Sequence, residues 1–414
     1  VLRPSIIWCD SRATGIGRDA FERLGRNRCL RSLLNSPGNF TLSKLRWVRE
    51  HEPGVFASVH KYFLPGDYIA MRLTDRICTT VPGLSEGMGW DFSANAPARF
   101  LFDEYCIPTA LVPETVPTFG DQGSLVARAA ADLGLRPGIP VTYRAGDQPN
   151  NALSLNVLEP GEVAATAGTS GVVYAVSGTL TPDPESRVNS FAHVNHTGAT
   201  TRIGVLLCIN GCGIANSWTR RLLGMGQIPY EELNARASSI PVGSGGLVVL
   251  PFGNGAERML GDREIGAQIS HASFTTHSDA HVIRAVQEGV AFSFTYGMEM
   301  MTEFGMLPRV IRAGNANMFL SRVFCETLAG AADVAIELYN TDGAQGAARG
   351  AALGAGFYRS PAEAFHGLAR RDVIDPDISK RGEFTETYGR WKETLERRLA
   401  DLSPVPASSG RSPA

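Results

Sequence analysis

Short apolar runs alternate with longer amphipathic segments through the second half of the chain, and this pattern predicts its secondary structure. Runs rich in β-branched and small apolar residues predict strands, and segments with a helical period predict helices. The predicted strands are residues 162–167, 309–313 and 333–339, and the predicted helices are residues 279–304, 319–329 and 345–358. Alternation of this kind predicts a mixed α/β fold built in layers.

The first half has a weaker pattern, but two segments stand out. Residues 5–8, Ser-Ile-Ile-Trp, resemble a strand already in progress, and the chain begins with Val1. We therefore expect a chain that starts inside its fold. Residues 140–145 predict a second strand, which runs into a tight glycine turn and then into a helix with proline in its first turn. Asp147 lies where that strand ends and that helix begins.

Length predicts more than one domain, because 414 residues exceed what a single hydrophobic core usually organises. The turn signal Leu-Glu-Pro-Gly at residues 158–161 is the predicted boundary. This gives a first domain over residues 1–157 and a second over residues 158–402. Residues 403–414 are small and proline-rich, which predicts a disordered tail because they cannot bury enough apolar surface to fold.

Composition narrows the classes of partner. With 39 basic against 41 acidic residues and no long run of either sign, the chain lacks the charge pattern of a protein that binds nucleic acid or an anionic membrane. No apolar stretch is long enough to span a bilayer, and the start lacks the order of a signal peptide. The seven cysteines are scattered, which is typical of reduced thiols. We therefore expect a cytoplasmic protein with a small, neutral substrate.

Asp147 is the first candidate catalytic residue. A carboxylate at the end of a strand can accept the proton of a substrate hydroxyl as that hydroxyl attacks a phosphoryl group. The carboxyl ends of strands are also where α/β proteins usually bind ligands. The structural alternative is an aspartate N-cap, which satisfies backbone N–H groups at the start of a helix. By itself the pattern favours the N-cap.

Residues 162–176 contain two β-rich runs joined by Gly168, Thr169, Ser170 and Gly171, which predicts a hairpin. Glycine lets a backbone approach a phosphate closely, and the loop amides and two hydroxyls supply hydrogen-bond donors. An ordinary hairpin turn has the same residues, and the pattern alone favours that alternative.

Two further patterns carry less information. Residues 310–319 predict a strand, a Gly/Asn loop and a helix, a geometry that can hold a nucleotide, although they are not a Gly-x-Gly-x-x-Gly motif. His193 and His196 lie close together, as do His277 and His281, but neither pair has a third ligand at a metal-site spacing. Surface or hydrogen-bonded structural histidines are the favoured interpretation.

Three segments near the start carry a resemblance to a known family. Residues 8–12 read Trp-Cys-Asp-Ser-Arg, residues 44–53 read Lys-Leu-Arg-Trp-Val-Arg-Glu-His-Glu-Pro, and residues 63–69 contain Leu-Pro-Gly-Asp-Tyr. In order and spacing these segments resemble the FGGY family of carbohydrate kinases, and within it the xylulokinases most. Similar segments continue to about residue 358, so the resemblance extends over most of the chain.

The resemblance implies a fold and a reaction. The fold is a pair of actin/hexokinase-like, ribonuclease-H-like domains around a cleft, with the sugar on the side of the first domain and ATP on the side of the second. The reaction is transfer of the γ-phosphoryl group of ATP, with Mg²⁺ offsetting phosphate charge, to the terminal hydroxyl of D-xylulose, which yields D-xylulose 5-phosphate. Asp147 is the implied general base, and Gln148 and Trp90 are implied sugar-binding residues. A homodimer is also expected from the family.

The resemblance also implies a set of nucleotide-binding residues in three loops of the second domain. They are Gly168, Thr169, Ser170, Gly213, Ser217, Gly314 and Asn317.

Some positions depart from the family pattern. The family's opening strands, with an Asp-x-Gly-Thr-Ser phosphate hairpin, are absent from this sequence, so we expect an incomplete first domain and assign no metal ligands. Asn39, Glu86, Gln268 and Ala313 stand where other residues are usual. Two alternatives therefore stay open: a kinase for another polyol or sugar acid, such as ribulose, gluconate or glycerol, and a non-catalytic relative that binds sugar or nucleotide.

Overall fold

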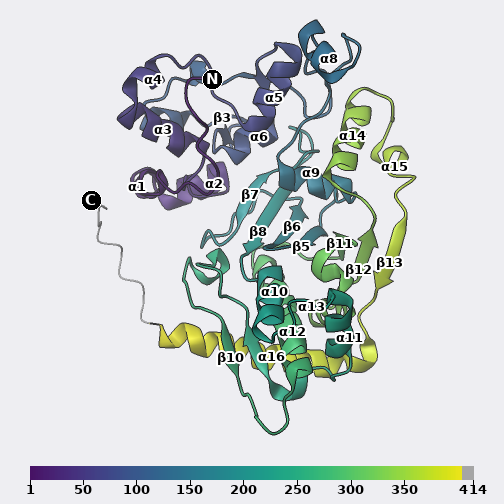
Figure 1. The fold of residues 1–414 in the computed structure, drawn as a ribbon. Helices are drawn as coiled ribbons and strands as arrows, with labels where there is room; N and C mark the ends of the chain where they lie inside the picture. The colour runs from purple at the N-terminus through teal and green to yellow at the C-terminus, as the bar shows by residue number, and fades with distance from the viewer. Residues whose placement is uncertain (403–414) are drawn as a thin grey trace.

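The computed structural model describes residues 1–402, so the tail predicted at 403–414 lies outside the described residues. The chain before α9 forms a helical lobe, seen at the top of Figure 1 in purple and blue. Its helices are α1 (Thr14–Leu24), α2 (Arg26–Leu33), α3 (Thr41–His51), α4 (Pro53–Ala57), α5 (Pro65–Thr74), α6 (Val81–Glu86), α7 (Arg99–Glu104) and α8 (Ala127–Leu133), with a 3₁₀ turn at Thr109–Leu111. Its strands are two-residue pairs: β1 (Cys78–Thr79) with β4 (Glu114–Thr115), and β2 (Trp90–Asp91) with β3 (Ala96–Pro97).

The strand predicted at residues 5–8 is wrong, since residues 1–13 form no strand. A strand needs a partner for its backbone hydrogen bonds, and none of the described strands lies alongside this segment. A side chain holds it instead: Lys44 Nζ, on α3, donates to the carbonyl oxygen of Ile7 at 2.7 Å. Arg12 lies 4.4 Å over the ring of Trp47, also on α3. The two amino-terminal motif segments therefore pack against each other.

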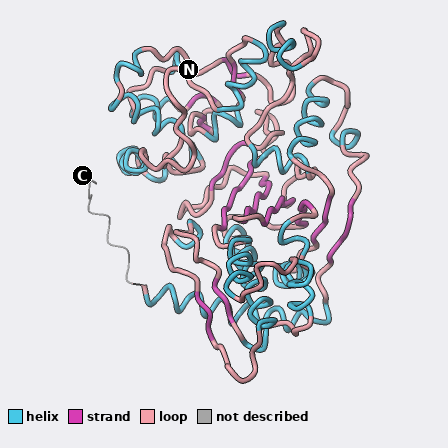
Figure 2. The backbone as a smooth tube through the Cα atoms, in the orientation of Figure 1, coloured by secondary structure: helices cyan, strands magenta, loops and turns pink. Residues whose placement is uncertain are grey.

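A seven-stranded sheet organises the rest of the chain, and Figure 2 shows most of the strands gathered in the middle of the molecule. The strand order is β13-β12-β11-β5-β6-β8-β7. β5, β6, β8 and β7 pair in antiparallel fashion, β11 is parallel to both β5 and β12, and β13 is antiparallel to β12. The strands are β5 (Glu162–Ala167), β6 (Gly171–Ser177), β7 (Asn189–Ala192), β8 (Ile203–Ile209), β11 (Val310–Gly314), β12 (Ile336–Tyr339) and β13 (Arg370–Ile374); β9 (Val248–Leu250) and β10 (Gln268–Ser270) form a separate pair.

Helices pack around this sheet. They are α9 (Asp147–Ser154), α10 (Gly213–Leu222), α11 (Tyr230–Ser238), α12 (Asp279–Thr302), α13 (Arg322–Ala332), α14 (Gly343–Gly354), α15 (Pro361–Ala364) and α16 (Arg381–Asp401), with 3₁₀ turns at Ser244–Gly246, Arg258–Leu260, Asn317–Leu320 and Ile378–Lys380. Figure 1 places α10, α11, α12, α13 and α16 below the sheet, and α9 and α14 above it.

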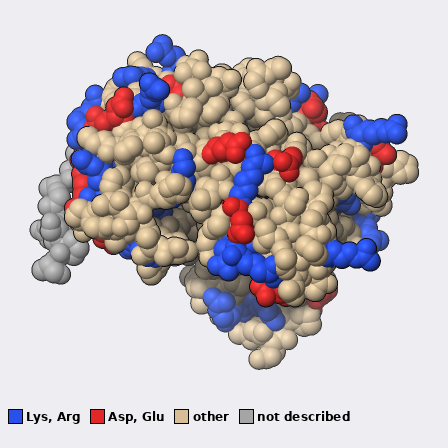
Figure 3. Space-filling model, turned by 90° about the horizontal axis from the view of Figure 1, so that it is seen from above, with Lys and Arg blue, Asp and Glu red and all other residues tan. Residues whose placement is uncertain are grey.

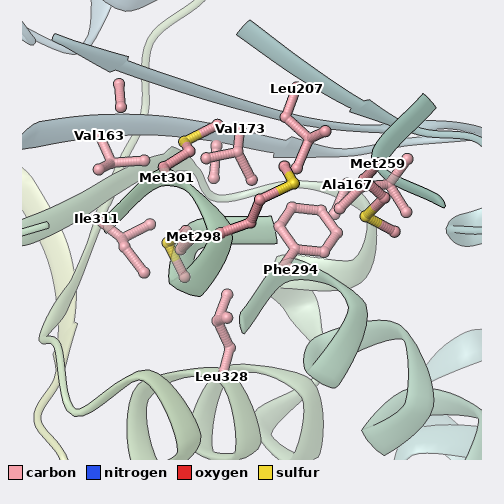
Figure 4. Close-up of a cluster of buried hydrophobic side chains, with 14 of the residues drawn as sticks. Val163, Ala167, Val173, Leu207, Met259, Phe294, Met298, Met301, Ile311 and Leu328 are labelled. Atoms are coloured by element: carbon pink, nitrogen blue, oxygen red, sulfur yellow. The ribbon is translucent and has the colours of Figure 1, made fainter. Parts of the chain in front are cut away.

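The main core forms between the sheet and α12. Figure 4 shows Phe294, Met298 and Met301 of α12 directed at the strand residues Val163 and Val173, and all five side chains are at most 3% exposed. Burial of each large side chain of this kind contributes roughly 1.5–3 kcal/mol. α12 is buried around most of its circumference, and its buried charged residues Arg284 and Glu288 are paired with each other at 2.7 Å.

Most of the predicted elements of the second half are confirmed. The strand predicted at 162–167 is β5, and those predicted at 309–313 and 333–339 are β11 and the shorter β12. The helices predicted at 279–304, 319–329 and 345–358 are α12, α13 and α14. α12 begins where predicted, and the other ends differ by two to four residues. α13 begins later than predicted because a 3₁₀ turn precedes it.

The strand predicted at residues 140–145 is wrong. This segment makes single bridges, Ser124 with Pro140 and Phe119 with Tyr143, rather than a ladder. Residues 119–125 of the helical lobe run beside this segment. Gly120 N donates to Thr142 O at 2.9 Å and Val141 N donates to Gly123 O at 2.8 Å, but these bonds are irregularly spaced and build no continuous ladder.

Over residues 1–402, no helix combines the length and apolar character that crossing a membrane requires. The seven cysteines are unpaired. In the face drawn in Figure 3, basic and acidic side chains are interleaved between wide areas of other residues.

His193 is a buried structural histidine, as one of the two favoured interpretations expected. Its Nδ1 lies 2.9 Å from the hydroxyl of Tyr174, and its Nε2 lies 3.0 Å from the carbonyl oxygen of Val157. Because a carbonyl only accepts, Nε2 carries the proton and Nδ1 accepts from the tyrosine. Burial lowers the pKa of His193 to about 4. His277 and His281, by contrast, lie near the surface. His277 bonds to the carbonyl oxygen of Gly245, and His281 bonds to the hydroxyl of the neighbouring Ser278.

We expect His193 to make the protein sensitive to acid. The folded pKa of about 4 is below the value of 6.5 expected for an unfolded chain, so the unfolded state binds more protons between these limits. The free energy of unfolding should therefore fall as the pH is lowered from 6.5 to 4, by up to about 3 kcal/mol from this residue. Urea titrations at several pH values measure this slope. His193→Gln should flatten it relative to the exposed control His366→Gln, and an equal slope in both variants would contradict the assignment.

Candidate active site

Asp147 is the first residue of α9, and its carboxylate is exposed. Its Oδ1 accepts from the backbone N–H of Gln148 at 2.9 Å, and its Oδ2 accepts from Nε2 of Gln148 at 3.2 Å. The N-cap position belongs to Gly146, which has no side chain to cap with. The N-cap alternative for Asp147 is therefore wrong, and the carboxylate remains available to a ligand.

A stripe of glycines on α14 holds the segment that carries Asp147. Gly346, Gly350 and Gly354 are four residues apart, so they share one face of the helix. A Cβ at Gly354 would lie 2.0 Å from the carbonyl oxygen of Thr142, and one at Gly350 would lie 2.7 Å from the ring of Tyr143. Only a helix face without side chains can approach the segment this closely.

Hydrogen bonds strengthen this contact at both ends of the segment. Thr142 Oγ1 donates to the carbonyl oxygen of Ala351 at 2.7 Å. Asn150 Nδ2, one turn into α9, donates to the carbonyl oxygen of Gly343 at 2.8 Å. Asp147 thus lies between two residues, Thr142 and Asn150, that are hydrogen-bonded to α14. α14 follows the predicted domain boundary in the sequence, whereas Asp147 precedes it.

A buried ion pair fixes the same segment to α5 in the helical lobe. Arg144 Nε lies 2.9 Å from Oδ1 of Asp67, and both side chains are less than 10% exposed. The contact has ion-pair distance without the alignment of a hydrogen bond. Asp67 also accepts from the backbone N–H of Leu64 and the hydroxyl of Thr79, both at 3.0 Å. Burial raises the pKa of Asp67, and the charge of Arg144 opposes that rise.

A second carboxyl group lies beside Asp147. Glu86 ends α6, and a Cβ built on Gly146 would lie 2.5 Å from its Oε1. Sequence reasoning noted Glu86 only as a departure from the family pattern. No local signal could have placed it here, because 60 residues separate the two positions.

The predicted hairpin is present between β5 and β6. Thr169 and Ser170 are exposed at its tip, and their side chains make no hydrogen bonds within residues 1–402. The loop carbonyls receive the first N–H groups of α10: Gly213 N donates to Gly168 O at 2.9 Å, and Ile214 N donates to Thr169 O at 3.1 Å. The hairpin and the start of α10 therefore form one unit, and the exposed loop hydroxyls take no part in that contact.

Glu257 secures the loop before α10. Its fully buried carboxyl accepts from the backbone N–H groups of Asn210 and Gly211 at 2.9–3.1 Å. Burial raises the pKa of Glu257 to about 7, although these two hydrogen bonds oppose the rise.

The third predicted loop meets the hairpin. Gly314 ends β11, and Asn317 adopts a left-handed backbone with φ of 55°. The amide nitrogen of the Asn317 side chain would lie 3.8 Å from a Cβ at Gly168, so the two loops are neighbours. The structure thus brings together Gly168, Gly213 and Asn317 from three separate parts of the sequence.

The negative charge of Asp147 acts on Cys208, a residue of the sheet that carries the hairpin. Cys208, on β8, pairs with Val172 of β6 two residues beyond Ser170. Burial raises the pKa of the Cys208 thiol, although part of its surface reaches solvent, and the negative charge of Asp147 contributes to the rise. Asp147 and the hairpin strands are therefore within electrostatic range of each other.

Trp90 and Ser217 differ from the other predicted site residues, because Trp90 is buried and Ser217 bonds within its own helix. Trp90 is only 7% exposed and packs in the main core, although its Nε1 lacks a hydrogen-bond partner within residues 1–402. Ser217 Oγ donates to the carbonyl oxygen of Ile214 in its own helix at 3.0 Å. Their predicted roles in binding sugar and ATP stay predictions.

Known proteins are similar to this chain in both its N-terminal and its C-terminal part. The N-terminal domain of the FGGY family of carbohydrate kinases matches residues 1–154, and the C-terminal domain of that family matches residues 163–358. A xylulose kinase from Klebsiella pneumoniae is 28% identical over 355 residues, which cover 85% of this chain and 70% of that protein.

Solved structures of carbohydrate kinases have a similar fold. A xylulose kinase from Rhodospirillum rubrum has a TM-score of 0.86 at 27% identity, covering 96% of this chain and 81% of its own. A gluconate kinase from Lactobacillus acidophilus shares the fold, with a TM-score of 0.84 at 19% identity, covering 96% of this chain and 80% of its own. The predicted fold of two actin/hexokinase-like domains is confirmed.

Proposed function

Because this chain belongs to the FGGY family of carbohydrate kinases, we propose that it phosphorylates D-xylulose with ATP and that Asp147 is the general base. The observation that carries the proposal is the exposed carboxylate of Asp147 at the start of α9, anchored to both lobes. Such a group can reach a ligand without losing its position.

The proposed reaction is a direct phosphoryl transfer. One oxygen of Asp147 accepts the proton of the terminal sugar hydroxyl as the hydroxyl oxygen bonds to the γ-phosphorus of ATP. The bond between that phosphorus and the β,γ-bridging oxygen breaks, and ADP leaves. Gln148 donates to the other Asp147 oxygen, so it orients the carboxylate and is placed to contact the sugar as well.

For ATP, the proposal uses the three loops that meet at the hairpin. Thr169 and Ser170 offer their hydroxyls and backbone N–H groups to phosphate oxygens, while Gly168, Gly213 and Ser217 shape that loop pair. Gly314 and Asn317 are proposed to contact the adenosine of ATP. The open space at Gly168, where no atom would come within 3.8 Å of an added Cβ, fits close approach by a phosphate.

Mg²⁺ is the proposed metal, bound with ATP. Within residues 1–402, no group of three or more His, Cys, Asp or Glu side chains is arranged to hold a metal ion, so its main ligands would be the phosphates of ATP. When bound there, it offsets charge on the transferring phosphoryl group.

The proposal assigns residues 1–157 to the sugar side and residues 158–402 to the ATP side. The two family domains that match the chain meet between residues 154 and 163, which supports a boundary at this turn. A cytoplasmic homodimer is part of the same proposal.

D-xylulose is proposed because the similar proteins at 27–28% identity are xylulose kinases. The test is ADP release from ATP and Mg²⁺ with D-xylulose, ribulose, gluconate and glycerol. We expect D-xylulose to give the highest kcat/KM, by at least about tenfold. A higher value with another acceptor would replace the substrate, and ADP release with none of them would favour a non-catalytic binding protein.

A further inference from the structure

One carboxyl oxygen beside the proposed general base has no hydrogen-bond partner. Glu86 is half-buried as a whole, but its Oε1 is inaccessible to solvent and bonds to nothing within residues 1–402. A buried polar atom of this kind costs free energy unless something satisfies it. In native proteins such an atom calls for an explanation, and a functional role is one explanation.

The position of Glu86 is set from two sides. The preceding residue, Ser85, accepts through Oγ from the backbone N–H of Ala192 on β7 at 2.9 Å, which fixes the end of α6 against the sheet. On the other side, a Cβ at Gly146 would lie 2.5 Å from Oε1 and 2.6 Å from Oε2 of Glu86. The carboxyl group therefore rests on the backbone one residue before Asp147 and, in this position, leaves no room for a Cβ there.

No cation compensates Glu86 within residues 1–402. The nearby Arg144 is paired with Asp67, and Glu86 takes part in no ion pair. The charged groups that act on it are the carboxylates of Asp147 and Asp67. Tyr143 and Tyr174 also interact with it electrostatically. Burial raises the pKa of each phenol, and the negative charge of Glu86 raises it further.

This environment keeps a proton on Glu86. Burial first, and then the charges of Asp147 and Asp67, raise its pKa to about 8. At neutral pH the group is therefore mostly a neutral carboxylic acid, with one O–H to donate and a carbonyl oxygen that can accept. That combination complements a hydroxyl group, which also donates and accepts.

We propose that Glu86 binds a second hydroxyl of the acceptor sugar, beside the hydroxyl that Asp147 deprotonates. The inference rests on the proposed function and extends it to specificity. A neutral polyol can hydrogen-bond to the carboxyl group from the side of Oε2, which, unlike Oε1, is not closed off from solvent. A sugar acid would place a further negative charge beside Asp147 and Asp67, so the same arrangement selects against acidic acceptors.

The test compares Glu86→Ala and Glu86→Gln with the exposed control Asp103→Ala on α7 of the same lobe. The readouts are the Kd for D-xylulose by calorimetry without ATP, the KM values for both substrates, and the Tm. Glu86→Ala should weaken sugar binding by about tenfold or more and leave the KM for ATP unchanged. Glu86→Gln keeps a donor and an acceptor and should stay within about threefold of the unaltered chain.

The pH dependence gives an independent readout. Sugar affinity of the unaltered chain should weaken as the pH rises through about 8, where Glu86 loses its donor, and Glu86→Gln should show no such loss. A folded Glu86→Ala that binds sugar as tightly as the unaltered chain would overturn the inference. If Glu86→Ala does not fold, the same affinity profile in Glu86→Gln and the unaltered chain would overturn it.

The failure of this inference differs from failure of the proposed function. If the unaltered chain binds and phosphorylates D-xylulose but Glu86 has no effect on sugar affinity, only the inference fails. If no acceptor binds to the unaltered chain, the proposed function fails, and the role of Glu86 fails with it.

Discussion

Asp147→Asn should reduce sugar-dependent ADP release by roughly 10²–10⁴-fold, because asparagine cannot accept the proton of the attacking hydroxyl. The variant should keep the fold. Asp147 is exposed, it does not cap its helix, and asparagine Oδ1 can still accept from the N–H of Gln148. Steady-state kinetics at saturating ATP and sugar measure the loss, and a Tm within a few degrees of the unaltered chain shows that stability is not its cause.

Asp279→Asn is a matched control. Asp279 is also the first residue of a helix, and its Oδ1 accepts from the next backbone N–H at 2.8 Å. It shares the local geometry of Asp147 without the proposed chemistry, so its variant should retain nearly full activity. If Asp147→Asn turned over sugar as fast as this control, Asp147 could not be the general base.

Gly213→Ala should have the second largest effect, on ATP. An added Cβ would lie 2.3 Å from the carbonyl oxygen of Gly168, the same atom to which Gly213 N donates. Relieving this overlap must move the hairpin away from α10 and disturb Thr169 and Ser170. Overpacking of this kind typically costs about 1–3 kcal/mol. If the strain falls on the nucleotide loop, the KM for ATP should rise by about tenfold or more, with a smaller change in the KM for sugar.

Gly226→Ala is the control for that prediction. Gly226 follows α10, no atom would come within 4 Å of its added Cβ, and its φ is not positive. The two variants carry the same chemical change, so only the contact with Gly168 distinguishes them. Equal KM values for ATP in both variants, with both folded, would show that the hairpin does not hold the nucleotide.

The sequence by itself determined the layered α/β character of the second half, because the periods of strands and helices are local properties of the chain. It also determined the hairpin at residues 168–171 and the family, since β5 and β6 and the matching segments each depend on neighbouring residues. Two predicted strands failed because no partner strand is available to them. Residues 5–8 have the composition of a strand but no neighbouring strand, and residues 140–145 have only isolated bridges.

Only the tertiary structure decided what surrounds Asp147. The N-cap alternative is wrong because Gly146, not Asp147, occupies the N-cap position of α9. The glycines of α14 are explained by their close contacts with residues 142–154, which are far from α14 in the sequence. Glu86 has no sequence signal that relates it to Gly146. Hydrogen bonding, burial and charge at the site depend on distances between residues remote in sequence, and those distances are set by how the two lobes pack. Periodicity along one segment carries no information about them.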